Sequence, residues 1–337
     1  MLQVGRAPGE PNVIIDPDLP TLAVVLDPTA LRAHLRESLP GRVPESTDLE
    51  IRVLRHHPGK RCVVDIGWRT GAASPSLIGK VYAKDRSDVH RLLEEVSRAG
   101  FGPREEFSIP QPTAYLPALR LLLQEKVEGR PATDAFLSDD EPERTAAAER
   151  CARWLARFHA MRLRTGPRLD LSGHLLSLAR WSGRLAALGD PLAGKAGTLF
   201  TRLEAAAAKL PRTDPCTNHG DYTHHQVILA PGRTVTVDWD KSCVADPSHE
   251  VARFVVGLQR LALRRLGSIR ALDAAADVFL KTYAAAAGSD LTGPLAFHRA
   301  AICLEHAKHD VHKQAHGWPE KATATLDEGL RVLAEGF

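Results

Sequence analysis

The sequence predicts an α+β protein in two parts: a front built on an antiparallel β-sheet with one helix, and a larger, mostly helical back that contains a β-hairpin. Two observations favour this class. Apolar residues alternate with a period of two in most of the chain before Gly129, and beyond it they recur at helical spacing. The segment "QVILAPGRTVTVDWD" interrupts the helical part with two alternating runs around a turn. We therefore expect a first domain over residues 1–124, a hinge over 125–129 and a second domain over 130–337.

The composition agrees with a folded protein of this size. A chain of 337 residues can bury a core in each part, and 44% hydrophobic and 25% charged residues are typical of globular domains. The net charge of +3 is spread without a long single-sign block, so we expect no nucleic-acid partner. The five cysteines form no C-x-x-C pair, which favours a reducing compartment. No long apolar run is present, so we expect a cytoplasmic protein without a membrane partner.

The front elements follow one another in a simple order. Residues 27–39 begin with Asp-Pro and space three leucines at helical intervals, which predicts a short capped helix. Three β-branched or aromatic runs, separated by turn compositions, then predict an antiparallel meander: "IRVLRHH", "RCVVDIGW" and "SLIGKVYA". A helix over 87–100 stops at Gly100, and the strand "RLLLQEKVEG" closes the front.

The hairpin of the helical part brings polar side chains to one end. A turn centred on Gly232 pairs Leu229 with Val235, and the same ladder places Gln226 opposite Asp238. Carboxylate and amide oxygens at one point suit Mg²⁺, which prefers such donors.

The loop before the hairpin supplies a further carboxylate. Asp221 lies five residues before Gln226 in a segment without helix or strand pattern, so we expect it over the same point. The histidines His219, His224 and His225 lack the spacing of zinc ligands. We expect His219 to act as a scaffold that hydrogen-bonds the backbone.

These residues carry a family resemblance that covers most of the chain. "HGDYTHHQ" followed by "VDWD" resembles the motifs H-G-D-x-x-x-x-N and I-D-W/F of the aminoglycoside phosphotransferase family, which includes choline-kinase-type enzymes. "LARFHA", "ADPSHEVARF" and "FLKTY" are similar to further motifs of that family, in the same order. The resemblance implies a bilobal protein-kinase-like fold that uses ATP and Mg²⁺ to phosphorylate a hydroxyl of a small molecule. The first domain is then the nucleotide-binding lobe, and the second the catalytic and substrate lobe.

The resemblance assigns roles to the polar cluster. Asp221 matches the catalytic aspartate that accepts or orients the proton of the attacking hydroxyl. Asp238 matches the aspartate that holds Mg²⁺, and Gln226 stands where the family usually has an asparagine ligand. Glutamine offers the same amide oxygen on a stem that is one methylene longer. A catalytically weak nucleotide-binding pseudokinase is therefore an open alternative.

The front of the chain must then bind the nucleotide. Alternation places Lys80 on one strand face with Ile78 and Tyr82, and its position resembles the lysine that contacts the α- and β-phosphates. The helix offers Glu94 or Glu95 as its ion-pair partner, unless both only solvate the outer face of that helix.

Two further segments of the front are candidates for nucleotide binding. In the turn "PGKR", Lys60 and the backbone N–H groups either approach the phosphates or form an ordinary surface hairpin. In the hinge, backbone groups near Glu125 and Val127 would bind adenine. An ordinary edge strand would look the same in the sequence.

The acceptor is less constrained than the nucleotide. Glu305, His309, His312 and His316 follow helical steps, so they either wall an acceptor pocket or form a solvated polar face. The slightly basic chain argues against polycationic aminoglycosides, whose sites need carboxylates. Sugars, amino alcohols, other metabolites, or a Ser or Thr of a biosynthetic peptide are the candidates.

Overall fold

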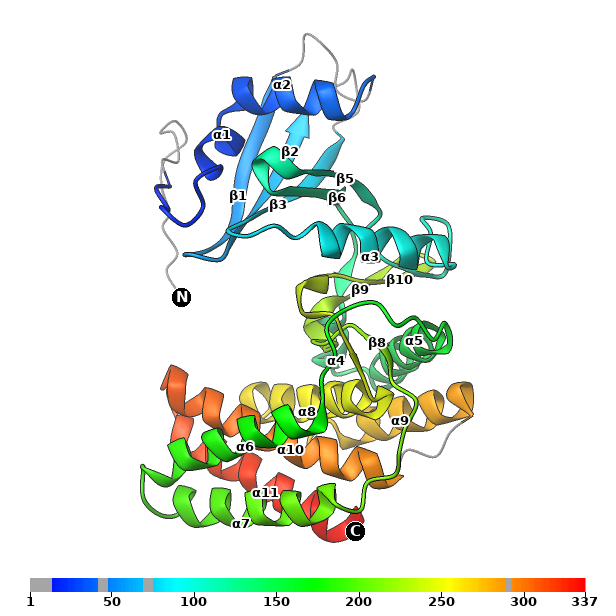
Figure 1. Ribbon diagram of the computed structural model, residues 1–337. Coiled ribbons are helices and arrows are strands. Elements are labelled where there is room, and N and C mark those ends of the chain that lie inside the picture. The colour runs from blue at the N-terminus through cyan, green and yellow to red at the C-terminus, as the bar shows by residue number, and fades with distance from the viewer. Residues whose placement is uncertain (1–13, 42–47, 69–74, 289–291, 337) are drawn as a thin grey trace. The chain divides into compact units, whose positions relative to one another are not determined.

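The computed structural model describes residues 14–41, 48–68, 75–288 and 292–336 (Figure 1). The chain divides into two compact units. The first comprises Met1–Arg98 and Pro110–Val127, and the second comprises Ala99–Ile109 and Glu128–Phe337. The turn predicted between the second and third strands lies largely in residues 69–74, outside the described ranges.

The first unit is built on one antiparallel sheet of five strands in the order β1-β2-β3-β6-β5. The strands are β1 (Leu49–His57), β2 (Arg61–Trp68), β3 (Ser76–Tyr82), β5 (Pro112–Leu116) and β6 (Leu121–Glu125). The predicted meander of three strands and the later apolar strand are confirmed. The sequence prediction missed β5, a short strand at the edge of the sheet that begins with a proline.

Two helices, α1 (Leu22–Leu26) and α2 (Pro28–Ser38), and a 3₁₀ turn η1 (Pro117–Leu119) cover one face of this sheet, whereas α3 (Ser87–Arg98) contacts the edge strand β5. The predicted cap of α2 is confirmed, because Asp27 accepts from the backbone N–H of Thr29 at 2.8 Å. Apolar residues of α1 and α2 share a core with alternate residues of β2 and β3, such as Val64 and Val81. Since neighbouring strand residues face opposite ways, Lys80 belongs to the other face.

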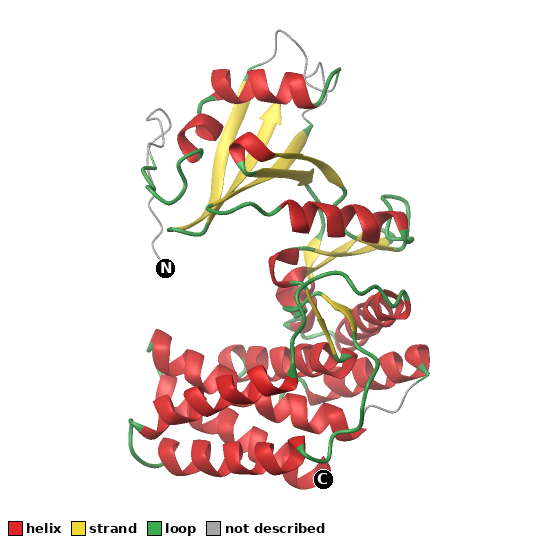
Figure 2. Cartoon of the chain, viewed as in Figure 1, coloured by secondary structure: helices red, strands yellow, loops and turns green. Residues whose placement is uncertain are grey.

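The second unit contains short strands among many helices (Figure 2). Four strands form a sheet in the order β4-β10-β9-β7, and β8 pairs with β11. Their bounds are β4 (Phe107–Ser108), β7 (Arg130–Pro131), β8 (Cys216–Asn218), β9 (Val227–Ala230), β10 (Arg233–Thr236) and β11 (Cys243–Ala245). The predicted hairpin is therefore β9 and β10.

The register predicted for this hairpin is wrong by one residue. Thr234, not Val235, pairs with Leu229. The reason is the turn, which contains only Pro231 and Gly232, the latter with a φ of 66°. A loop of two residues shifts every pair by one position relative to a loop of three.

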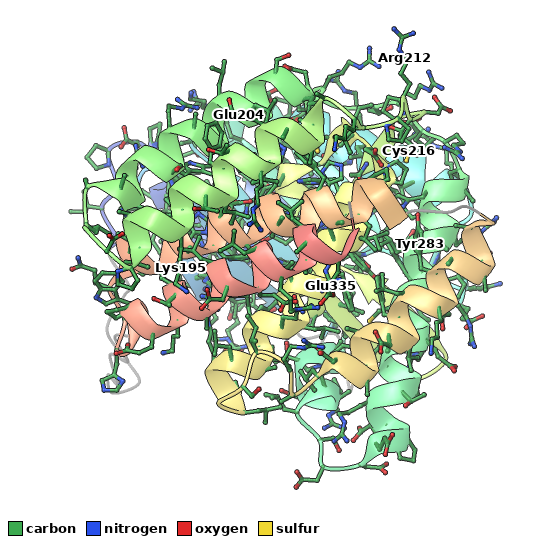
Figure 3. All side chains as sticks on the ribbon, turned by 90° about the horizontal axis from the view of Figure 1, so that it is seen from below. Lys195, Glu204, Arg212, Cys216, Tyr283 and Glu335 are labelled. Atoms are coloured by element: carbon green, nitrogen blue, oxygen red, sulfur yellow. The ribbon has the colours of Figure 1, made fainter. Side chains whose placement is uncertain are left out.

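The helices of the second unit form its main core. They are α4 (Ala132–Phe136), α5 (Glu141–Ala160), α6 (Leu171–Ala186), α7 (Leu192–Ala207), α8 (Pro247–Arg265), α9 (Asp273–Ala287), α10 (Thr292–Lys313) and α11 (Trp318–Gly336), with 3₁₀ turns η2 (His224–Gln226) and η3 (Trp239–Lys241). Helices α6, α7, α10 and α11 pack through buried leucines and alanines. Lys195 of α7, labelled in Figure 3, forms an ion pair with Asp327 of α11.

Two further observations concern these helices. No helix in the described ranges is long and apolar enough to span a membrane. The predicted stripe of Glu305, His309, His312 and His316 on one helix is wrong at its last position, because α10 ends at Lys313. His312 is exposed, whereas Glu305 and His309 are half-buried.

Candidate active site

The loop that carries Asp221 depends on a glycine. Gly220 has a φ of 80°, in the left-handed region that favours glycine. A Cβ atom at this position would lie 1.9 Å from the carbonyl oxygen of Lys241, which is far inside contact distance. The backbone of the loop therefore touches the backbone of η3, and a larger residue at position 220 would push the two apart.

A buried carboxylate holds this loop through hydrogen bonds to its backbone. Glu250, in the first turn of α8, is fully buried and accepts the backbone N–H groups of His219 and Gly220, each at 2.7 Å. Burial alone would raise the pKa of Glu250, but the hydrogen bond and charge of His159 and the contacts with His219 outweigh it, so the pKa is lowered. An ionised Glu250 thus fixes two consecutive amides of the loop.

One residue from each of three further family motifs joins the contacts around Glu250. His159, near the end of α5, places Nε2 3.4 Å from Glu250 and Nδ1 2.8 Å from the hydroxyl of Tyr283. Tyr283 projects from α9 and is labelled in Figure 3. Residues from "LARFHA", "ADPSHEVARF" and "FLKTY" therefore form one buried hydrogen-bonded network beneath the loop, and sequence spacing gave no sign of this contact.

His219 joins the loop to the hairpin. Its Nδ1 accepts the backbone N–H of Asp221 at 3.3 Å, so Nε2 carries the proton and donates to the carbonyl oxygen of Val237 at 2.9 Å. The prediction that His219 is a scaffold bound to the backbone is confirmed.

The same hydrogen bonds bring Asp221, Gln226 and Asp238 into one neighbourhood. The backbone N–H of Val237 donates to the carbonyl oxygen of Gln226 at 2.8 Å. Gln226 therefore lies opposite Val237, and the predicted pair of Gln226 with Asp238 is wrong by the same single residue as the rest of the ladder. Asp238 follows directly, and His219 links Val237 to Asp221.

Asp238 has an unusual backbone conformation. Its φ is 67° and its ψ is 61°, a left-handed conformation that is unfavourable by about 1–2 kcal/mol for a residue with a Cβ. Strand alternation ends at this residue, so the direction of its side chain is set by the local turn and not by the ladder. Strain of this kind is concentrated at functional positions.

The donors present here fit Mg²⁺. Gln226 and Asp238 offer one amide oxygen and one carboxylate, and Mg²⁺ commonly binds through one or two protein ligands plus waters and substrate phosphates. Within the described ranges, no three His, Cys, Asp or Glu side chains are grouped so as to hold a metal ion. One amide and one carboxylate would suit an ion that is shared with substrate phosphates.

Two cations that the sequence analysis did not single out flank Asp221. Lys241 Nζ lies 2.9 Å from Asp221 Oδ2, and Arg253 Nη1 lies 4.0 Å from Oδ1. Arg253 in turn binds Glu305 of α10 at 3.0 Å. Arg253 lies three residues after Glu250 on the same helix, a spacing that places both on one face. That spacing was the available signal.

The other two histidines of the loop form hydrogen bonds to Thr133. His224 is buried, with Nδ1 2.7 Å from Thr133 Oγ1, and the Nδ1 of His225 lies 3.3 Å from the same hydroxyl. Desolvation lowers the pKa of His224 to about 3, so its imidazole is neutral.

The nucleotide candidates of the first unit lie in regular elements. Lys80 is only 6% exposed, on β3 between Val63 of β2 and Leu122 of β6. Glu94 is 40% exposed and pairs with Arg98 of its own helix at 3.2 Å. Glu95 is half-buried as well, and because Glu94 already pairs with Arg98, Glu95 is the better candidate of the two for an ion pair with Lys80.

The backbone amides of the turn before β2 already have partners. The N–H of Gly59 donates to Asp16 Oδ2 at 3.0 Å, and the N–H of Lys60 donates to the carbonyl oxygen of His57 at 3.0 Å. In these positions the two amides serve the hairpin and the N-terminal segment. This favours the structural alternative for the turn over a phosphate-binding role.

The hinge residues end the first unit. Glu125 is the last residue of β6, and its backbone N–H donates to the carbonyl oxygen of Gln111 at 2.9 Å. Its carboxylate accepts the N–H of Gln111 at 3.1 Å. Val127 is the last residue of the unit.

Comparison with known proteins identifies the family. The model of the phosphotransferase enzyme family known as APH matches residues 68–296, which is most of the chain. The chain belongs to this phosphotransferase family. The matched range contains Lys80, Asp221, Asp238 and Glu250, whereas Lys60 lies outside it. A comparison with curated proteins found no match.

Solved phosphotransferases share the fold. A putative aminoglycoside phosphotransferase from Ralstonia eutropha JMP134 has a TM-score of 0.63 at 17% identity, over 92% of this chain and 99% of the other. Choline kinase from Cryptosporidium parvum Iowa II has a TM-score of 0.63 at 11% identity, over 92% and 96%. A glucosamine kinase solved with glucosamine, ADP and inorganic phosphate has a TM-score of 0.61 at 17% identity, over 92% and 87%. The protein-kinase-like α+β fold is therefore confirmed.

Proposed function

We propose that this phosphotransferase moves the γ-phosphate of ATP to a hydroxyl of a small molecule and requires Mg²⁺. The observation that carries the proposal is the held loop: Glu250 and His219 fix the backbone of residues 219–221, so that the Asp221 carboxylate stands at a defined place beside the hairpin. Phosphoryl transfer depends mainly on positioning and on neutralisation of charge. A carboxylate on a held loop, with two cations beside it, meets both needs.

Each candidate residue has one task in this proposal. Asp221 orients the acceptor hydroxyl and takes its proton as the new oxygen–phosphorus bond forms and the bond to the leaving ADP oxygen breaks. Gln226 and Asp238 would hold Mg²⁺, which neutralises phosphate charge when bound. Lys80 supplies a compact positive charge to the phosphates, and Glu95 orients Lys80. Backbone groups near Glu125 and Val127 bind the adenine.

Substitution of the proposed base tests the assignment. Asp221→Asn keeps the size of the side chain but removes its ability to accept a proton, and we expect the rate of acceptor-dependent ADP release to fall by about 10²–10⁴-fold. Nucleotide affinity, measured by calorimetry, should stay within a few fold. Asp214→Asn, at an exposed aspartate of the same unit, is the control and should leave the rate unchanged. An Asp221→Asn enzyme that turns over within a few fold of wild type would exclude Asp221 as the base.

Gln226 motivates the second candidate function, a nucleotide-binding protein without transfer activity. Its longer side chain must still satisfy the strict octahedral geometry of Mg²⁺. Nucleotide binding by the wild-type protein, together with no ADP release across a broad acceptor set, would favour this candidate over the kinase.

A further inference from the structure

Four charged side chains of the second unit alternate in sign around Asp221. Lys241 contacts one oxygen of Asp221 at 2.9 Å, and Arg253 lies 4.0 Å from the other. Glu305 then binds the far side of Arg253 at 3.0 Å. Each carboxylate of the row therefore has at least one cation beside it. We call these four residues the charge row.

Arg253 is a permanent part of this row. Its side chain is 11% exposed, and its Nε atom is buried without a hydrogen-bond partner. Burial alone lowers the pKa of Arg253, but the charges of Glu305 and Asp221 outweigh it and raise the pKa, so the guanidinium stays charged. It offers positive charge next to the place where the acceptor hydroxyl must lie.

Glu305, the other carboxylate of the row, is ionised and already paired with Arg253. Burial alone would raise its pKa, but the charges of Arg253, His306 and His309 lower it to about 2. The four charges of the row sum to zero, but its most exposed member is the cation Lys241, at 67%, whereas the side chains of Asp221 and Glu305 are 24% and 18% exposed. With its hydroxyl at Asp221, an ammonium group would come close to Lys241 and Arg253, and like charges about 4 Å apart repel by roughly 1–4 kcal/mol between bulk water and a protein surface.

We infer that the acceptor carries an anionic group, a carboxylate or a phosphate, near its reacting hydroxyl, and that Lys241 and Arg253 bind that group. The inference rests on the proposed function, because it places the acceptor hydroxyl at Asp221. Lys241 is the exposed contact, with 67% of its side chain accessible, whereas Arg253 forms the buried one. The glucosamine kinase with the same fold was solved with an amine-bearing sugar. This chain is predicted to prefer the opposite charge.

Four sugars with one ring skeleton test the inference: glucuronate, glucose 6-phosphate, glucose and glucosamine. Calorimetry in the presence of a non-hydrolysable ATP analogue and Mg²⁺ measures binding without turnover. We expect one or both anions to bind at least about tenfold more tightly than glucosamine, with glucose between them. The carboxylate and phosphate arms show which anion the site takes. An equal or tighter affinity for glucosamine, or no dependence on charge, would overturn the inference.

A charge reversal makes the test specific to the site. Lys241→Glu changes an exposed residue and should shift the preference towards glucosamine by at least about tenfold. Lys209→Glu, at an exposed lysine two residues after the end of α7, makes the same change in net charge and should leave the order as in wild type. If both variants behave alike, the charge row does not select the acceptor.

Turnover separates this inference from the proposed function. Acceptor-dependent ADP release with glucosamine preferred would retain the kinase and reject the anionic acceptor. Preferential binding of an anion without ADP release would retain the anion site and reject phosphate transfer.

Discussion

The two units hold their candidate residues in different ways. In the first unit, Lys80 and Lys60 belong to a meander of consecutive strands, where each strand pairs with its neighbour in sequence. In the second, Glu250 binds two loop amides that lie 31 and 30 positions before it, and the attached network links residues 91 and 124 positions apart. Local elements position the first set, whereas packing of distant helices positions the second.

Buried polar groups show the same contrast. Among the described residues, every histidine that is fully buried lies in the second unit: His159, His174, His219, His224, His249 and His298. The four described histidines of the first unit are partly exposed: His34, His56, His57 and His90. Each polar side chain buried in a core needs a hydrogen-bond partner, because an unpaired one lowers stability. We therefore expect single substitutions to destabilise the second unit more than the first.

Gly220→Ala should have the largest effect. The new Cβ would meet the carbonyl of Lys241 at 1.9 Å, and φ at this residue is 80°, so the loop and η3 must separate. We expect destabilisation by about 4 kcal/mol or more and a fall in turnover of at least about 10²-fold, because Asp221 moves with the loop. Urea denaturation and ADP release measure the two effects.

Gly232→Ala is the matched control for that substitution. Gly232 also has a positive φ, 66°, but a Cβ there meets nothing within 4 Å. Only the backbone strain of about 1–2 kcal/mol remains. Equal effects of the two substitutions would show that the close contact at Gly220 has no role.

Glu250→Gln should have the next largest effect. The amide keeps the shape of the side chain but replaces one accepting oxygen with a donor that faces a backbone N–H. We expect a loss of about 2–4 kcal/mol in the free energy of unfolding. In the first unit, Glu94→Gln removes a surface pair with Arg98 and should change stability by no more than about 0.5 kcal/mol. Similar values for the two variants would contradict the contrast between the units.

Mild acid should have the smallest effect on the free energy of unfolding, and it should act through buried histidines of the second unit. The pKa of His224 is lowered to about 3 and that of His174 to about 4, against about 6.5 in an unfolded chain. Because the folded pKa is the lower one, the stabilisation is complete above pH 6.5 and is lost as the pH falls towards the folded pKa. At pH 5 each group should remove up to about 2 kcal/mol.

Urea denaturation at pH 7 and pH 5 measures this loss. His224→Gln should reduce the difference between the two pH values, whereas His34→Gln in the first unit should not change it. A pH dependence that is the same in all three proteins would show that burial of His224 does not contribute.

Much of the fold follows from patterns in the sequence, and the failures have identifiable causes. Alternation predicted β1, β2, β3 and β6, and the Asp27 cap predicted the start of α2. The hairpin was predicted, but its register was not, because the choice between a turn of two and of three residues depends on backbone dihedrals. The edge strand β5 has too little apolar alternation to stand out.

For the candidate site, too, local sequence patterns predicted some features and missed the contacts between distant elements. The motifs predicted that Asp221, Gln226 and Asp238 converge, and the structure links their backbone segments once His219 bridges the loop and the hairpin. The motifs did not reveal that Glu250 holds the loop or that Arg253 and Lys241 flank the carboxylate, because those contacts join elements far apart along the chain.

By itself, the sequence determined the two-part α+β organisation, the family and the polar residues of the phosphotransferase motifs, since periodicity and short motifs are local properties of a chain. Only the tertiary structure decided the hairpin register, the clamp at Glu250 and the charge row around Asp221. Those features arise when helices distant in sequence pack together, and the free energy of such contacts depends on distance and burial, which residue order alone does not contain.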